Sequence, residues 1–283
     1  GETTTDGETT TDGLDCVADP VDCHRATLLI PAEELAGALD LEGQVILDLR
    51  GAGAYAAGHV PGAVSFDPGS LRDEVDGVAG QVVDRPAAEA ALAAAGIGDG
   101  ASVVLYDAGD GQAASRVAWT LRYYGGPAAR QLDGGWSAWE AGGHPVEAEA
   151  ATPTNASLTL ADGDPLLRVD AAWVAAHLDD PKVALVDARS AAEYDSGRIP
   201  GGVLIPWQDN KGDDDRFLAG EPLRALYDAA SILAADTVVT YCQTGSRASV
   251  SWFAVMLLDH PDVRIYDGSW AEWGADPNLP KEP

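Results

Sequence analysis

The chain has 283 residues, more than one hydrophobic core usually organises, so its length suggests two domains. Hydrophobic residues make up 46% and charged residues 22% of it, as in globular proteins, and no run of about 18 apolar residues is present to span a bilayer. Seventeen basic and 46 acidic residues give a formal charge of -29, which argues against a nucleic-acid partner because phosphate backbones would be repelled. A small anionic ligand would therefore need a local site of positive charge.

The amino-terminal segment, residues 1–25, is expected to be a disordered, acidic, Thr-rich tether. The sequence Gly-Glu-Thr-Thr-Thr-Asp occurs twice at its start and offers nothing apolar to bury. Such a tether suits a spacer that holds a folded domain at the cell envelope, which favours an extracytoplasmic location (periplasmic, cell-envelope or secreted); a cytoplasmic tail is the alternative. Cys16 and Cys23 are close enough to form a small disulfide loop in an oxidising compartment, although two separate thiols fit the sequence equally well.

Most of the remaining sequence is an internal repeat. Four segments of the first half recur in the second half, in the same order and at nearly constant spacing. The pairs are residues 45–50 with 184–189, 58–62 with 197–201, 103–107 with 238–242, and 133–136 with 267–270. We therefore expect one domain at residues 26–148 and a second at residues 166–283. The linker, residues 149–165, overlaps a Pro- and Thr-containing stretch at residues 147–155.

Short apolar, β-rich runs alternate with Ala-rich stretches in both copies, a pattern typical of a parallel sheet with crossover helices. In the first copy we expect strands at residues 45–47 and 103–106 and helices at residues 87–95 and 113–124. In the second copy the expected strands are residues 184–186 and 237–241, and the helices are residues 223–233 and 248–258. The predicted fold class is α/β, with two similar domains that each contain a mainly parallel sheet flanked by helices.

The loop after the predicted strand 237–241 has the composition of a reactive site. Cys242 lies at the carboxyl end of this strand, where ligand sites of open α/β sheets gather. The N–H groups of such a loop and the N-terminus of the following helix favour the thiolate form of the cysteine and the binding of an anionic ligand next to it. Gly245 permits the tight turn, and Arg247 adds a permanent cation. A lone cysteine after a strand is otherwise most often a small buried hydrophobic residue. The first copy has Asp107 at the corresponding position, which cannot hold a persulfide.

Residues 241–249, Tyr-Cys-Gln-Thr-Gly-Ser-Arg-Ala-Ser, resemble the active loop of tandem rhodaneses, the thiosulfate sulfurtransferases. Four further stretches are similar to motifs of this family, at residues 58–62, 132–136, 187–194 and 263–274. The resemblance implies an enzyme with a non-catalytic first domain and a catalytic second domain, without a metal or an organic cofactor. Its sulfur donor would be the small anion thiosulfate, and its acceptor cyanide or a thiol.

The resemblance also assigns roles to residues. Cys242 would take the outer sulfur of the donor as a persulfide, while Arg247 would hold the sulfonate end and assist the departure of sulfite. The loop residues implied in substrate binding are Gln243, Thr244, Gly245 and Ser246.

Two further arginines are candidates for substrate contact, because each adds positive charge to a motif of the second copy. Arg189 could instead pair with an acidic neighbour, and Arg198, which stands where the family has His, could be a solvated surface residue. Glu193 departs from the pattern as well, since some animal members have a substrate-binding arginine at that place.

Three alternatives remain open at this stage. Mercaptopyruvate sulfurtransferases have an uncharged loop resembling Cys-Gly-Ser-Gly-Val-Thr, so Arg247 favours thiosulfate, although a keto acid could use the same group for its carboxylate. Related phosphatases use a Cys-x5-Arg loop, and the Cys-x4-Arg loop here should be too narrow for phosphate. A non-catalytic sulfur-binding or sensing module is the third alternative. We expect a monomer in each case.

Overall fold

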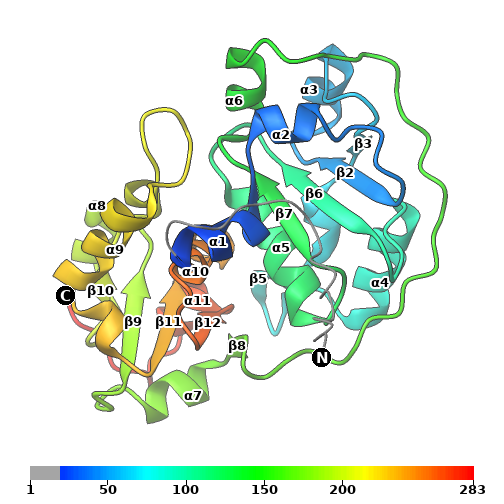
Figure 1. Ribbon diagram of the computed structural model, residues 1–283. Coiled ribbons are helices and arrows are strands. Elements are labelled where there is room, and N and C mark those ends of the chain that lie inside the picture. Colours follow the sequence, from blue (N-terminus) through cyan, green and yellow to red (C-terminus); the bar gives the residue numbers. More distant parts are fainter. Residues whose placement is uncertain (1–19) are drawn as a thin grey trace, which may run out of the picture.

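The chain folds into two α/β domains, each built on a five-stranded parallel sheet (Figure 1). The computed structural model describes the backbone of residues 20–283 and the side chains from residue 23 onward. The proposed tether sequence up to residue 19 and Cys16 therefore lie outside the described residues. Among the described residues, no helix has the length and apolar character needed to cross a membrane.

The first domain has the strand order β1-β7-β6-β2-β3, and the second has the matching order β10-β9-β11-β12-β8. The first sheet contains β1 (Leu29–Ile30), β2 (Gln44–Asp48), β3 (Val64–Ser65), β6 (Ser102–Tyr106) and β7 (Ala129–Leu132). The second contains β8 (Arg168–Val169), β9 (Val183–Asp187), β10 (Val203–Leu204), β11 (Thr237–Tyr241) and β12 (Val263–Tyr266). A separate antiparallel hairpin, β4 (Arg72–Val75) with β5 (Val78–Val82), extends from the first domain.

Helices cover the sheets in both domains. Those of the first half are α1 (Pro20–Leu28), α2 (Ala32–Ala36), α3 (Ala52–Ala57), α4 (Arg85–Ala94), α5 (Gln112–Tyr123) and α6 (Gly135–Ala141), with the 3-10 turn η1 (Pro68–Leu71). Those of the second half are α7 (Ala171–Ala176), α8 (Ala191–Asp195), α9 (Gly220–Ala229), α10 (Ser246–Leu257) and α11 (Ser269–Trp273), with η2 (Trp207–Asn210) and η3 (Ile232–Ala234).

The predicted fold class is confirmed, and so are the strands and helices placed from the sequence. The central strands β2, β6, β9 and β11 coincide with the apolar runs, because a parallel strand covered on both faces has no polar side to show. The helix expected at residues 223–233 ends earlier, at Ala229. Ser231 adopts a left-handed conformation with φ of 59°, which ends the helix and starts the short turn η3.

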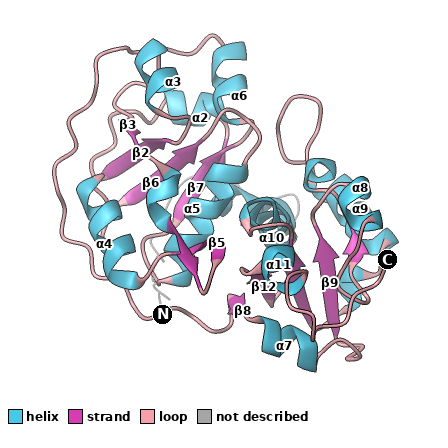
Figure 2. Cartoon of the chain, turned by 180° about the vertical axis from the view of Figure 1, so that it is seen from behind, coloured by secondary structure: helices cyan, strands magenta, loops and turns pink. Residues whose placement is uncertain are grey.

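The two domains share one hydrophobic core. Helices α5 and α10 pack against each other between the two sheets (Figure 2). One continuous cluster of buried side chains joins residues of the first domain, such as Val117 and Trp119, to residues of the second, such as Phe253 and Leu257. Helix α10 is buried along residues 248–257, and apart from Ser249 and Ser251 this stretch is apolar, as expected for a helix enclosed on all sides. The relative position of the domains is therefore set by tight packing rather than by the linker.

Helix α1 corrects the predicted extent of the tether. The tether was expected to reach residue 25, but the chain is helical from Pro20 to Leu28. His24 contacts the carbonyl oxygen of Met256 in α10 through its Nε2, at 2.9 Å, and α1 packs on α10, β1 and β7. The contact with both domains explains why this short polar segment is ordered. The predicted pairing of Cys23 with Cys16 involves a residue outside the described part of the chain.

The domain interface is pseudo-symmetric, because each domain reaches the other with the same kind of contact. The N–H of Val82, at the end of the first-domain hairpin, donates to Asp267 Oδ2 at 2.8 Å. In the second domain, the N–H of Phe217 donates to Asp133 Oδ1 at 3.0 Å. Asp133 and Asp267 are the corresponding residues of the repeat. The duplication is thus visible in the interface as well as in the sheets.

Asp267 also pairs with Arg116, and this pair allows a prediction about stability. Arg116 Nη1 lies 2.6 Å from Asp267 Oδ1, and both side chains are almost fully buried. Asp267→Asn would leave the Arg116 guanidinium buried without a full counter-charge, so we expect the free energy of unfolding to fall by about 3 kcal/mol. Urea denaturation would measure this loss. The matched control Asp236→Asn breaks the exposed ion pair with Lys182, and it should hardly move the midpoint. Equal midpoints for both variants would contradict the prediction.

Candidate active site

The Cys242 thiol sits at the base of a tight loop between β11 and α10. The backbone N–H of Gly245 points at Cys242 Sγ over 3.1 Å, and helix α10 begins at the next residue, Ser246. Gly245 has a φ of 86°, a conformation that side-chain-bearing residues resist. Negative charge on the sulfur is therefore met by one aimed N–H donor and by the N-terminus of a 12-residue helix. Cys242 as a whole is only 1% exposed.

The segment that joins β12 to α11 forms hydrogen bonds with the backbone of Cys242. The N–H of Cys242 donates to Ser269 Oγ at 3.2 Å, and the N–H of Trp270 donates to the carbonyl of Cys242 at 3.0 Å. Ser269 has a φ of 53°, an unusual value for a residue with a side chain. The first copy has Gly135 there, with a φ of 55°, so the hydroxyl support is specific to the second domain. Sequence reasoning missed Ser269, and its one available signal was the exchange of Gly for Ser between the two copies.

Arg247 is already paired. Its Nη1 and Nη2 lie 2.7 and 2.8 Å from the two carboxylate oxygens of Glu193 in α8. These hydrogen bonds raise the pKa of Arg247 and lower the pKa of Glu193 from 4.5 to about 2. The charge of Cys242 also raises the pKa of Arg247, so this guanidinium lies close to the sulfur. A donor whose sulfonate binds Arg247, as the family resemblance implies, would share that guanidinium with the carboxylate of Glu193.

The other two arginines predicted to contact substrate have structural partners instead. Arg189 is buried; it donates to Asp187 at 2.7 Å and to the carbonyl of Gly197 at 2.8 Å. Arg198 lies 3.1 Å from Glu282 and bonds to the carbonyl of Pro283, so it attaches the carboxyl-terminal segment to the domain. Arg189 thus takes the alternative role considered for it, pairing with an acidic neighbour. Neither arginine lines the cavity beside the Cys242 loop.

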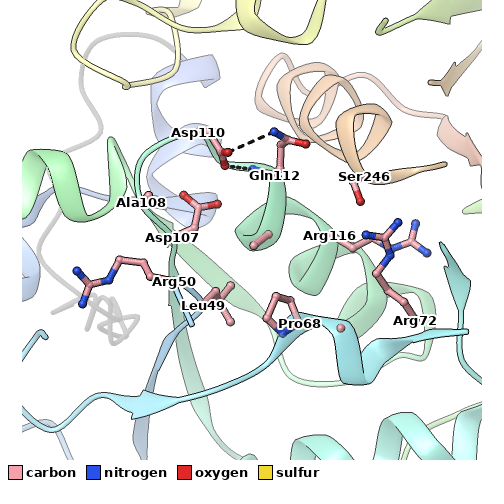
Figure 3. A pocket seen from close by; sticks show the side chains of 12 residues that line it. Leu49, Arg50, Pro68, Arg72, Asp107, Ala108, Asp110, Gln112, Arg116 and Ser246 are labelled. Carbon is pink, nitrogen blue, oxygen red and sulfur yellow. Dashed lines mark hydrogen bonds between the residues drawn. The ribbon is translucent and has the colours of Figure 1, made fainter. Parts of the chain in front are cut away.

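Two further cations beside the Cys242 loop come from the first domain, and sequence reasoning missed them. Arg72, at the start of β4, donates through Nη2 to the carbonyl of Thr244 at 3.2 Å. Arg116, from α5, shares with Arg72 the carbonyl of Gly80 as an acceptor, at 3.2 and 3.3 Å. Figure 3 shows both guanidinium groups on the same side of the cavity as Ser246. No motif marks them, because their role depends on how the domains pack.

This cavity has a volume of about 380 Å³ and lies between the two corresponding loops. Ser246 of the Cys242 loop is on its wall, together with Asp107 and Asp110 of the first domain. Thr244 faces a second, open hollow beside the β4–β5 hairpin. Of the predicted loop residues, Thr244 and Ser246 therefore reach open space, while Gly245 and the backbone of Gln243 serve the loop structure.

Asp107 occupies in the first domain the place that Cys242 has in the second. Its carboxylate accepts hydrogen bonds from the N–H groups of Gly109 and Gly111 at 3.0 and 3.1 Å, and from that of Ala114 at 3.1 Å. Burial raises its pKa, and the loop N–H groups oppose this change. The first-domain loop therefore holds a carboxyl group on its N–H donors and has no thiol nucleophile.

No group of three or more His, Cys, Asp and Glu side chains in the described part of the chain could hold a metal ion. The nucleophile at this site is the cysteine itself. A sulfur nucleophile at a helix N-terminus, with guanidinium groups beside it, is suited to attack a small anionic donor.

Comparisons with known proteins agree with this chemistry. The rhodanese-like domain model matches the chain twice, at residues 31–142 and 170–276. A Pseudomonas aeruginosa protein named a probable 3-mercaptopyruvate sulfurtransferase is 35% identical over 284 residues, covering 89% of this chain and 96% of that protein. The Arabidopsis thaliana mitochondrial thiosulfate/3-mercaptopyruvate sulfurtransferase 1 is 29% identical over 81% of this chain and 68% of that protein.

Among solved structures, the complex of EanB with hercynine has a TM-score of 0.84 and 25% identity, and the match covers 95% of this chain and 72% of that one. Both halves of the present chain take part in the family match, in agreement with the repeat and with the two corresponding sheets. The chain therefore belongs to the rhodanese family, with two rhodanese-like domains in tandem, and is a sulfurtransferase.

Proposed function

We propose that the protein transfers the outer sulfur of thiosulfate to a thiophilic acceptor, cyanide or a thiol, through a persulfide on Cys242. The observation that carries this proposal is the geometry of the Cys242 loop: one N–H aimed at the sulfur, a helix N-terminus, and guanidinium groups from two domains. The first domain has Asp107 at the corresponding position, so only the second domain would carry sulfur.

The reaction proceeds in two balanced steps. The Cys242 thiolate attacks the outer sulfur of thiosulfate, the sulfur–sulfur bond of the donor breaks, and its electron pair leaves with sulfite. Cyanide then attacks the outer sulfur of the persulfide, forms thiocyanate and returns the thiolate. Neither step needs an oxidant or a metal, because the transferred sulfur has the same oxidation level in thiosulfate, in the persulfide and in thiocyanate. The Gly245 N–H, which points at Sγ, would stabilise the thiolate that attacks in the first step and is regenerated in the second.

Burial of the cysteine limits which donors can react. Since Cys242 is 1% exposed, a donor must present a narrow terminal sulfur. The outer sulfur of thiosulfate carries no substituent and meets this requirement, and its sulfonate end can remain among the surrounding guanidinium groups. The charge of a dianion also gains more from these groups than the single carboxylate of a keto acid does.

Mercaptopyruvate is the second candidate donor, supported by the name of the Pseudomonas aeruginosa relative. Its carboxylate could use the same cationic surroundings. We expect kcat/KM for thiosulfate to be several-fold higher than for 3-mercaptopyruvate, measured with the same acceptor and at the same ionic strength. A higher value for mercaptopyruvate would assign the site to that donor instead.

Mass spectrometry after incubation with thiosulfate tests the persulfide directly. The native chain should gain one sulfur, about 32 Da, and lose it again on addition of cyanide. Cys242→Ser should gain none. That variant keeps Cys16 and Cys23, so it also controls for sulfur added elsewhere. A sulfur adduct of equal yield on the variant would overturn the assignment of Cys242.

The Glu193–Arg247 pair predicts an effect of charge on donor binding. Because the pKa of Glu193 is about 2, this carboxylate stays ionised at every pH used for assays and keeps Arg247 occupied. Glu193→Gln should free Arg247 and lower KM for thiosulfate several-fold across pH 6 to 9, as steady-state assays would show. An unchanged KM would mean that Arg247 acts only on loop structure.

The same pair predicts how stability depends on pH. The folded-state pKa of Glu193 is lowered, so the stabilisation from the pair is complete above pH 4.5 and is lost as the pH falls through about 2. The difference in urea midpoint between the native chain and Glu193→Gln should therefore shrink only in acid. A difference that shrinks on the alkaline side would contradict the lowered pKa.

A further inference from the structure

The domain without a cysteine faces the Cys242 loop with positive charge. Arg72 and Arg116 both belong to the first domain, and both line the cavity of about 380 Å³ that separates the two loops (Figure 3). Ser246, the first residue of α10, is on the same wall. The second domain thus contributes Ser246 to the cavity, next to the reactive loop, and the first domain contributes these cations together with Asp107 and Asp110.

The charge balance of this region leaves Arg72 without a counter-ion. Arg247 is paired with Glu193, and Arg116 is paired with Asp267. Arg72 is partly buried, yet among the described residues it has no carboxylate within 4 Å. It donates to the carbonyls of Gly80 and Thr244 and to the Thr244 hydroxyl. Its Nη1 has no hydrogen bond to any described residue. A half-buried guanidinium in this state has lost water without gaining an anion, which makes it a receptor for one.

Arg116 supplies a second, independent observation. It is 1% exposed, and its Nε–H is buried with no hydrogen-bond partner in the described structure. Leaving such a donor unsatisfied costs roughly 1 to 3 kcal/mol, so native structures seldom keep one without a ligand or a solvent molecule to accept from it. The unsatisfied donor belongs to a residue that lines the same cavity as Arg72.

The pseudo-symmetry of the chain indicates what kind of group is missing. Lys211 stands at the place in the second domain that Arg72 has in the first, directly after the 3-10 turns η2 and η1. Lys211 Nζ bonds to the carbonyl of Gly109, just as Arg72 bonds to that of Thr244. The loop that Lys211 faces already contains the carboxyl group of Asp107, whose oxygens occupy the N–H donors of that loop. The loop that Arg72 faces contains the thiol instead, and its anion must come from outside.

We propose that Arg72, with the positive charge of Arg116 beside it, binds the oxyanion end of the sulfur donor in the interdomain cavity, so that the non-catalytic domain supplies the anion-binding half of the active site. The ligand class is a small tetrahedral sulfur oxyanion: the sulfonate end of thiosulfate and the sulfite that leaves. This inference rests on the proposed function, because it names the residues that would recognise its donor. Arg72 is then a specificity-determining residue for the first half-reaction and has no part in the second.

The experiment compares the native chain with Arg72→Gln, Arg72→Lys and Lys211→Gln. Lys211→Gln is the matched control, because it removes a cation from the corresponding position on the other side of the pseudo-symmetric interface. Two quantities are measured for each protein: KM and kcat with thiosulfate, and the rate at which dithiothreitol, an acceptor without a fixed charge, discharges a preloaded Cys242 persulfide. The second rate reports loop integrity without requiring an oxyanion to bind, because dithiothreitol reacts through its thiolate sulfur.

We expect Arg72→Gln to raise KM for thiosulfate about 10- to 100-fold, the effect of losing one charge-assisted hydrogen bond. Discharge by dithiothreitol should keep its native rate. Arg72→Lys should recover most of the loss, and Lys211→Gln should retain the native KM. An unchanged KM in Arg72→Gln would overturn the inference, and so would an equal loss in both half-reactions, since that result assigns Arg72 a purely structural role. If the native chain takes no sulfur from thiosulfate at all, the proposed function fails and the inference with it.

Discussion

The carboxylate of Asp267 is buried at the point where the two domains meet, and most of its contacts come from the other domain. Arg116 pairs with it at 2.6 Å and the N–H of Val82 donates to it at 2.8 Å. Asp267 begins the loop that supports Cys242 through Ser269. A buried carboxylate cannot lose such partners without a large cost, so the packing of the domains and the shape of the reactive loop depend on each other. Neither domain could keep this site in the same form by itself.

The two domains share the same strand–loop–helix backbone and differ in the side chain that the loop surrounds. In each copy a strand ends at a loop, a glycine with positive φ turns the chain, and a long helix follows. The first copy fills its loop with the carboxylate of Asp107, which accepts three N–H groups. The second copy holds the Cys242 thiol, which receives one aimed N–H and leaves room for a negative sulfur. The same loop of N–H donors thus binds a structural carboxyl group in the first domain and surrounds a reactive thiol in the second.

Local charge and overall charge are opposite in this protein. The chain carries a formal charge of -29, yet three guanidinium groups, those of Arg50, Arg72 and Arg116, line the cavity next to Ser246. Solvent and salt screen the distant acidic surface over about 8 to 10 Å, whereas a cation in a half-buried cavity acts at short range and in a lower dielectric. The acidic surface therefore does not prevent the cavity from holding a small anion. It does limit the positive charge near the site to the few arginines that the fold buries there.

The sequence by itself determined the repeat, the fold class and the place of the reactive cysteine. These features are local: apolar runs form strands, and Cys242, Gly245 and the helix that follows lie within a few residues of one another. Only the tertiary structure decided which charges act there. Glu193 and Arg247 meet across 54 positions of sequence, and Arg72 meets Thr244 across 172. Contacts at such separations arise from how the sheets, hairpin and domains pack, and a motif contains no information about that packing.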